Sequence, residues 1–159
     1  MYSLSKYPLF VLCMLMLDPV AYSQHGGANI DSLQTKVSGD QKRELLPAYK
    51  KLTEYYMEKA PEKSIEYSRK AVKIAEEEGL PGKKADFLSK AGKAYYLNNH
   101  YQQAAKVLME AEEIYKTRKN LRNQSEVLRL MGEVYYKTGE NEKSSHYLQK
   151  ALKLSKKLN

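Results

Sequence analysis

The chain has 159 residues, which is enough for one domain, and its hydrophobic content of 42% can support a core. The formal net charge is +8. The single cysteine, Cys13, excludes an internal disulfide framework and a zinc site built on several cysteines.

The first 23 residues have the pattern of a signal peptide. Lys6 precedes an apolar run over residues 9–17, which is shorter than the roughly 20 residues that span a bilayer. Ala21 and Ser23 place small side chains at the −3 and −1 positions of a cleavage site before Gln24. We therefore expect export to the periplasm or the outside of the cell. The alternative is a buried N-terminal helix.

Residues 24–39 form a polar leader that we expect to be mobile or to contain a short helix. Ile30, Leu33 and Val37 recur there at helical spacing. Asp40 is a candidate N-cap for the next helix. Pro47 lies either in the first turn of that helix or at a kink within it, because a proline inside a helix loses a backbone hydrogen bond.

From residue 40 onward the sequence repeats every 40 residues. The phrases PEKSIEYSRKAVKI, YQQAAKVLMEAEEI and NEKSSHYLQKALKL begin at residues 61, 101 and 141, and a Tyr-Tyr pair stands upstream of each. A fixed period of this size predicts a repeat array. We expect an all-α domain over residues 40–159, with repeats at 40–79, 80–119 and 120–159, each a hairpin of two antiparallel helices.

Small residues at fixed positions predict how the two helices of a repeat pack. Gly92 and Gly132 lie inside the first helices, where glycine costs roughly 1 kcal/mol relative to alanine. A helix tolerates this where another backbone approaches closely. The facing positions on the second helices are also small, and they are Ala71, Ala104, Ala111, Ser144 and Ala151. We expect Tyr55, Tyr95 and Tyr135 to fill the space beside them.

These residues resemble the tetratricopeptide repeat family. Its pattern has a large residue, Leu-Gly and Tyr on the first helix, and small, large and small residues on the second. Repeat 3 carries this pattern at Leu128, Met131, Gly132, Tyr135, Ser144, Leu148 and Ala151. Repeat 1 is degenerate, with Leu52 where Gly is usual. The resemblance implies three hairpins stacked as a right-handed superhelical solenoid that binds proteins and catalyses nothing.

More specifically, the leader and the Pro61 motif resemble exported tetratricopeptide segments of Bacteroidetes-type signalling proteins. This resemblance implies a periplasmic scaffold or sensory domain of a signalling system. The alternative is a stand-alone secreted adaptor that binds an anionic surface or a peptide.

In such a stack the first helix of each repeat lines the concave face. The register predicts a groove for a protein or peptide ligand, lined by Tyr56, Ser89, Lys93, Tyr96, Arg129, Glu133 and Tyr136. A row of tyrosines offers flat apolar area with hydroxyl groups. The alternative is that these tyrosines only pack between successive helices.

The sequence favours no enzyme. His25, His100 and His146 are scattered, and there is no phosphate-binding glycine loop and no G-x-S-x-G motif. We expect no catalytic residue, no cofactor, no metal and no nucleic-acid partner.

The last repeat carries an apolar stripe that a longer array would cover with a further helix. It includes Leu148 and Leu152. We expect this edge to be covered by self-association, by a partner, or by residues beyond Asn159.

Overall fold

The computed structural model describes residues 30–35 and 43–158. Within these ranges the chain is helical and contains no strand. The elements are a short helix over residues 30–35, the 3₁₀ turn η1 (Arg43–Leu45), and the α-helices α2 (Leu46–Tyr56), α3 (Pro61–Glu77), α4 (Pro81–Leu97), α5 (Tyr101–Thr117), α6 (Leu121–Lys137) and α7 (Asn141–Ser155). The expected signal peptide and the Asp40 cap lie outside the described residues.

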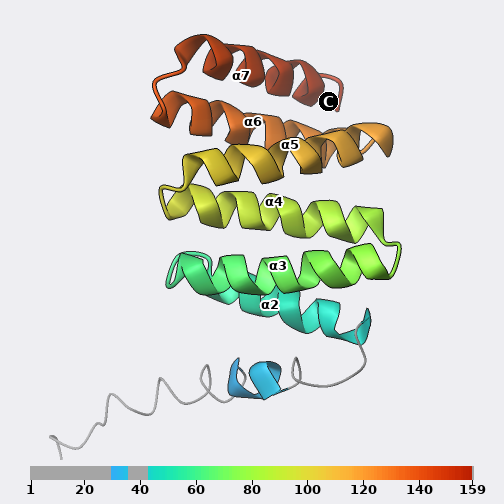
Figure 1. Cartoon of the computed structure of the whole chain (residues 1–159). Helices are drawn as coiled ribbons and strands as arrows, with labels where there is room; N and C mark the ends of the chain where they lie inside the picture. The colour runs from blue at the N-terminus through green and yellow to red at the C-terminus, as the bar shows by residue number, and fades with distance from the viewer. Residues whose placement is uncertain (1–29, 36–42, 159) are drawn as a thin grey trace, which may run out of the picture.

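The six α-helices of the described ranges form three antiparallel hairpins, α2/α3, α4/α5 and α6/α7, in one stack (Figure 1). Each helix packs against the next in sequence, and α4 also contacts α6. The prediction of an all-α solenoid of three hairpins is confirmed. None of the helices in the described ranges has both the length and the apolar character needed to cross a bilayer.

Local sequence explains where these helices begin and end. Pro61 and Pro81 occupy the first turns of α3 and α4, where a backbone N–H has no helical partner in any case. The turns that follow α3, α4, α5 and α6 each contain one residue with a left-handed backbone: Gly79, Asn99, Lys119 and Gly139. This conformation lets the chain reverse within two or three residues. Pro47 lies in the first turn of α2, and the kink we considered is not needed.

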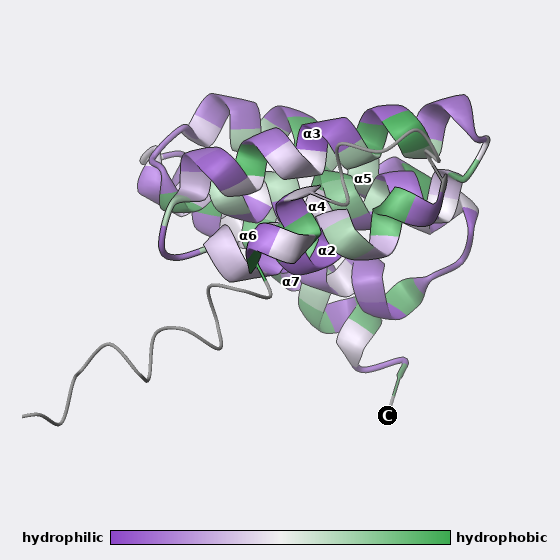
Figure 2. Cartoon of the chain, turned by 90° about the horizontal axis from the view of Figure 1, so that it is seen from below, coloured by the Kyte–Doolittle hydropathy of each residue, from purple (hydrophilic) through white to green (hydrophobic). Residues whose placement is uncertain are grey.

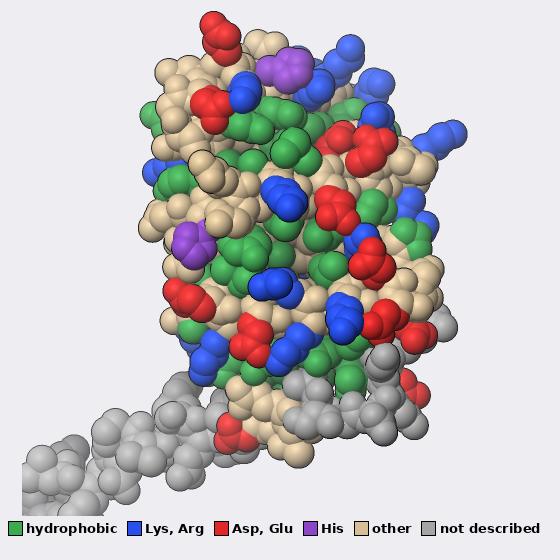
Figure 3. All heavy atoms as spheres, in the orientation of Figure 1, with side chains coloured by type: hydrophobic (Ala, Val, Ile, Leu, Met, Phe, Trp, Pro, Cys, Tyr) green, Lys and Arg blue, Asp and Glu red, His purple; other side chains and the backbone are tan. Residues whose placement is uncertain are grey.

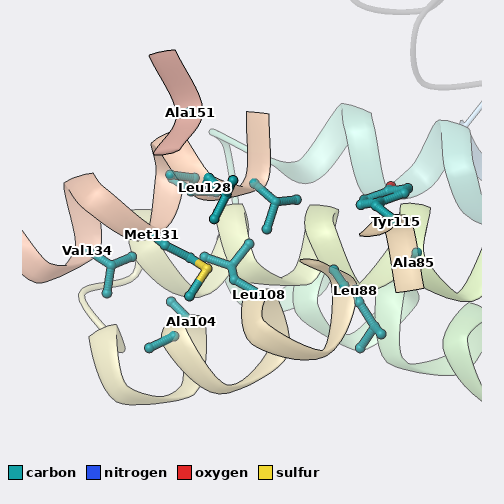
Figure 4. Close-up of a cluster of buried hydrophobic side chains, with 13 residues drawn as sticks. Ala85, Leu88, Ala104, Leu108, Tyr115, Leu128, Met131, Val134 and Ala151 are labelled. Atoms are coloured by element: carbon teal, nitrogen blue, oxygen red, sulfur yellow. The ribbon is translucent and has the colours of Figure 1, made fainter. Parts of the chain in front are cut away.

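The buried apolar side chains lie between the helices. Hydrophobic and hydrophilic residues alternate along each helix (Figure 2). The largest cluster joins α4, α5, α6 and α7, and smaller clusters join α2 and α3 to α4. Leu128 and Met131 of α6 point toward Leu108 of α5, which is completely buried (Figure 4). The core is therefore continuous from one hairpin to the next.

The second and third hairpins are each closed by a contact between a small and a large residue. A Cβ atom at Gly92 would lie 2.4 Å from Cδ2 of Leu108, and one at Gly132 would lie 2.6 Å from Cγ of Leu148. Such distances are too short for any side chain beyond hydrogen. The facing residues of the second helices that the sequence analysis named are also buried: Ala71, Ala104, Ala111, Ser144 and Ala151.

The first hairpin differs from our expectation by one residue. Tyr56, and not Tyr55, occupies the place of Tyr135. The ring of Tyr56 stacks on that of Tyr67 with 5.8 Å between ring centres, just as the rings of Tyr135 and Tyr147 stack with 5.3 Å between their centres. Tyr55 is 36% exposed. The assignment of Tyr55 to repeat packing is therefore wrong.

The same shift places Thr53, and not Leu52, at the position of the two glycines. Thr53 is fully buried against α3, where Ser64 Oγ donates a hydrogen bond to its carbonyl oxygen at 2.9 Å. Ser68 Oγ donates to Thr53 Oγ1 at 3.4 Å. Two residues of intermediate size, Thr53 and Ser68, thus replace the glycine and leucine that meet in the later hairpins.

The physical reason is a different hydrogen bond at the turn between α2 and α3. His100 and Glu140 donate their backbone N–H to the carbonyl five residues earlier, on Tyr95 and Tyr135. Ala60 donates to the carbonyl of Tyr56, only four residues earlier. No residue between Met57 and Ala60 has a left-handed backbone. The closing hydrogen bond spans one residue fewer, and the register of α2 differs by one position.

We expect Gly92→Ala to lower the free energy of unfolding by about 1–3 kcal/mol, because the added methyl overpacks the buried Leu108. Gly132→Ala should lower the free energy of unfolding by a smaller amount, since Leu148 is 41% exposed and can turn toward solvent. Urea unfolding followed by circular dichroism measures both losses. Adding Leu108→Ala to Gly92→Ala should give a total loss smaller than the sum of the two single losses. Equal losses for the two glycine variants would contradict this account.

Candidate functional site

The first helices of the hairpins, α2, α4 and α6, surround a hollow of about 830 Å³. A second hollow of about 640 Å³ continues it along α4, because the two share Glu54, Ser89, Lys90 and Glu126. We call the two together the groove. The first hollow is lined by Glu54, Tyr55, Met57, Glu58, Lys59, Ser89, Lys90, Lys93, Tyr96, Leu97, Glu126, Arg129, Leu130 and Glu133.

Five of the seven residues that we expected in a groove line this hollow. They are Ser89, Lys93, Tyr96, Arg129 and Glu133. That they contact a ligand stays a prediction.

Tyr56 and Tyr136 do not line the groove. The hydroxyl of Tyr56 accepts a hydrogen bond from Gln34 at 3.2 Å, and its ring packs on Tyr67, so it belongs to the hairpin interior. Tyr136 is 67% exposed and lies by a separate hollow beside α7. The prediction that three tyrosines line the groove is therefore wrong for Tyr56 and Tyr136.

A change at one neighbouring position explains why Tyr136 is exposed whereas Tyr96 lines the groove. The ring of Tyr96 packs against that of Tyr101, the first residue of α5, with 5.9 Å between the ring centres. Asn141, the first residue of α7, stands at the corresponding position of the last hairpin. It offers no ring, so Tyr136 has no aromatic partner there.

Sequence reasoning missed several groove residues that share the helical faces of those it found. Lys90 is one turn before Lys93, and Glu126 is one turn before Arg129. Extending the predicted stripe by one turn would have found both. Tyr55 was missed for another reason, the register shift in α2.

Charges of both signs are balanced in the first hollow. Its cations are Lys59, Lys90, Lys93 and Arg129, and its anions are Glu54, Glu58, Glu126 and Glu133. Positive and negative side chains also intermingle on the face shown in Figure 3, with apolar atoms between them. A nucleic-acid site would call for a basic stripe, and this groove has none.

Two ion pairs hold part of this charge in place. Lys90 Nζ lies 2.7 Å from Glu54 Oε1 and joins α4 to α2. Arg129 pairs with Glu133 one turn along α6. Lys59 Nζ lies 3.9 Å from the centre of the Tyr55 ring, a cation–π contact at the rim of the hollow. Among the described residues Lys93 forms no ion pair, which leaves its ammonium group available to a ligand.

A partly buried hydrogen-bond network closes the other end of the groove. The Tyr115 hydroxyl of α5 donates to Asp86 Oδ1 of α4 at 2.8 Å, and Asn123 Nδ2 of α6 donates to the same oxygen at 3.5 Å. Burial raises the pKa of Tyr115, and the neighbouring Asp86 carboxylate raises it further. The phenol therefore stays neutral and acts as a hydrogen-bond donor that ties three helices together.

The described part of the chain contains no cluster of three or more His, Cys, Asp or Glu side chains that could hold a metal ion. Each buried polar side-chain atom in the described ranges has a hydrogen-bond partner. The groove presents charged, aromatic and apolar side chains that are suited to binding.

Residues 125–158, which cover α7 and most of α6, match the tetratricopeptide repeat family. A hairpin of two antiparallel helices occurs twice more in the preceding 80 residues, so the described chain has the fold of an all-α, tetratricopeptide-like solenoid. A comparison with curated proteins finds no match. Among solved structures, MamA matches with 16% sequence identity and a TM-score of 0.42, over 90% of this chain and 98% of that one.

The Tyr115 network predicts how stability changes with pH. Because the pKa of Tyr115 is raised above its ordinary 10.0 on folding, its stabilising effect is complete below about pH 10 and declines as the pH rises further. The difference in unfolding free energy between the wild type and Tyr115→Phe should therefore be constant below about pH 10 and shrink above it. Urea unfolding from about pH 8 to about pH 11 measures this, with Tyr136→Phe as the matched control. If the difference in unfolding free energy between the wild type and Tyr115→Phe grew with pH, the raised pKa of Tyr115 would be contradicted.

Proposed function

We propose that the groove binds a peptide segment of a partner protein, and that the protein is an exported scaffold or sensory domain of a signalling system. A protein–protein interaction scaffold is the general function that tetratricopeptide repeats support. The finer proposal rests on the groove and on the first 23 residues. The single observation that carries it is a hollow with apolar and aromatic surface set among charges of both signs.

The composition of the groove suits a peptide better than a small charged ligand. Tyr55 and Leu97 are 36% and 38% exposed, so ligand binding would bury apolar area that now faces water. Tyrosines combine such area with a hydroxyl group and are frequent at the energetic centres of protein interfaces. The fixed pair between Lys90 and Glu54 is flanked by Lys93, Glu58 and Glu126, which can pair with charges on a ligand.

The rigidity of the scaffold supports the same function. α2 and α4 are joined by the Lys90–Glu54 pair, while α4, α5 and α6 are joined through Tyr115, Asp86 and Asn123. A groove whose walls are fixed before binding loses little conformational entropy when a ligand enters.

Site-specific photocrosslinking in the producing cell tests the proposed groove. We expect a photoreactive residue in place of Lys93 to give a discrete crosslinked product with a partner protein. The same residue in place of Lys106, which is exposed on α5 and does not line the groove, should not give that product. Adding Tyr96→Ala should reduce the Lys93 product because it removes aromatic contact area. Equal yields at the two positions would count against a ligand in the groove.

Export is tested at the N-terminus of the purified protein. We expect the mature chain to begin at Gln24, as determined by N-terminal sequencing and intact mass. Ala21→Lys should block this processing, because a small residue is needed at the −3 position. Ala21→Ser is the matched control and should be processed as the wild type is. A mature protein that keeps residues 1–23 would refute the proposed cleavage.

A further inference from the structure

The outer face of α7 is exposed where the same face of the earlier hairpins is covered. Ser68 of α3 and Leu108 of α5 are both 0% exposed, whereas the corresponding Leu148 of α7 is 41% exposed. Leu152, one turn further on, is 56% exposed. The difference arises because α4 covers α3 and α6 covers α5, while no described helix follows α7.

The exposed residues form a narrow band along the helix, which we call the α7 stripe: Asn141, Ser145, Leu148 and Leu152. Together with Tyr136, Ser144 and Gln149 they line a shallow hollow of about 350 Å³. Two leucines side by side on a surface otherwise rich in lysine are the kind of apolar patch that marks an interaction site.

Among the described residues, the opposite end of the stack does not offer a matching apolar face. There the short helix over residues 30–35 lies beside the first hairpin, and Gln34 Nε2 donates to the hydroxyl groups of Tyr56 and Tyr67 (Figure 1). The exposed side of α2 carries Lys50 and Lys51, which have the same sign as the lysines of α7. A head-to-tail contact between copies would bring these like charges together.

The α7 stripe is complementary to itself when two copies run antiparallel. A two-fold axis near Leu148 places the large Leu152 of each copy over the small Ser145 of the other. Alternating large and small side chains in this way lets two helices approach closely.

The charges beside the stripe favour the same orientation. Glu142 in the first turn and Lys156 after the last turn lie on one flank of α7, and both are exposed. Neither forms an ion pair in the described part of the chain. In an antiparallel pair Glu142 of each copy lies opposite Lys156 of the other, whereas a parallel pair would place lysine against lysine. Surface charges of this kind add little affinity, but they select an orientation.

We infer that the protein forms a two-fold symmetric dimer in which α7 packs antiparallel against α7 of a second copy. The interface is isologous, since the same patch serves on both copies. One helical face is smaller than the roughly 800 Å² per partner of a standard interface, so the dimer is weak and depends on protein concentration. The grooves of both copies stay open, because α2, α4 and α6 line the groove and α7 does not.

Sedimentation velocity on the full chain over a range of concentrations tests the dimer. We expect the average mass to rise from one copy to two and no further. Leu152→Glu should abolish the rise, because it places a charge in the apolar contact. Met109→Glu is the matched control, since Met109 is 45% exposed on α5 and should leave the rise unchanged. Circular dichroism confirms that each variant is folded.

A charge exchange tests the orientation. Glu142→Lys alone and Lys156→Glu alone should each weaken dimerisation by about tenfold, because each creates two like-charge contacts. The two changes in one chain should restore the wild-type Kd. A chain that is monomeric throughout, or a dimer indifferent to Leu152→Glu, would overturn the proposal. So would a mass that keeps growing with concentration, which indicates head-to-tail assembly, or a double variant that is not restored.

Discussion

The close approach of the two helices within each hairpin is the constraint on which the rest of the structure depends. At Gly92 the first helix leaves room only for the side chain of Leu108, and at Gly132 only for that of Leu148. Because a leucine side chain of the second helix packs directly on the first helix there, the small residues of the second helices are buried and the hairpins keep a common shape. Hairpins of one shape stack regularly, and stacking alone brings the three first helices to one face.

The first hairpin shows that this constraint acts on the total volume of the contact and not on a particular residue. Thr53 and Ser68 fill the space that Gly92 and Leu108 fill in the second hairpin, and their hydroxyl groups are satisfied by hydrogen bonds inside the contact. Buried polar groups are tolerated when they are paired in this way. The hairpin shape therefore survives a complete change in the chemistry of its central pair.

Binding and self-association use different faces of the same stack. The groove depends on the first helices, and its charges are fixed partly by a pair between α2 and α4 and by a partly buried network among α4, α5 and α6. The α7 stripe lies on the second helix of the third hairpin, and the outer face of this helix has no neighbour in the described chain. A dimer formed through α7 would thus present two grooves and could hold two partner segments at once, which raises the apparent affinity for a partner with two such segments.

The sequence by itself determined the features that repeat locally: six helices, three hairpins, the small residues of their contacts, and the turns that reverse the chain. These follow from spacing along the chain, because helical periodicity and left-handed turns are set by near neighbours. The tertiary structure decided the register of α2 and the composition of the groove. Tyr55 and Tyr56 exchange places because the hydrogen bond that closes the turn before Pro61 spans one residue fewer, and Tyr136 is exposed because Asn141 replaces the ring of Tyr101. Both outcomes depend on which residue lies opposite in space, and the even spacing of the tyrosine pairs carries no information about that.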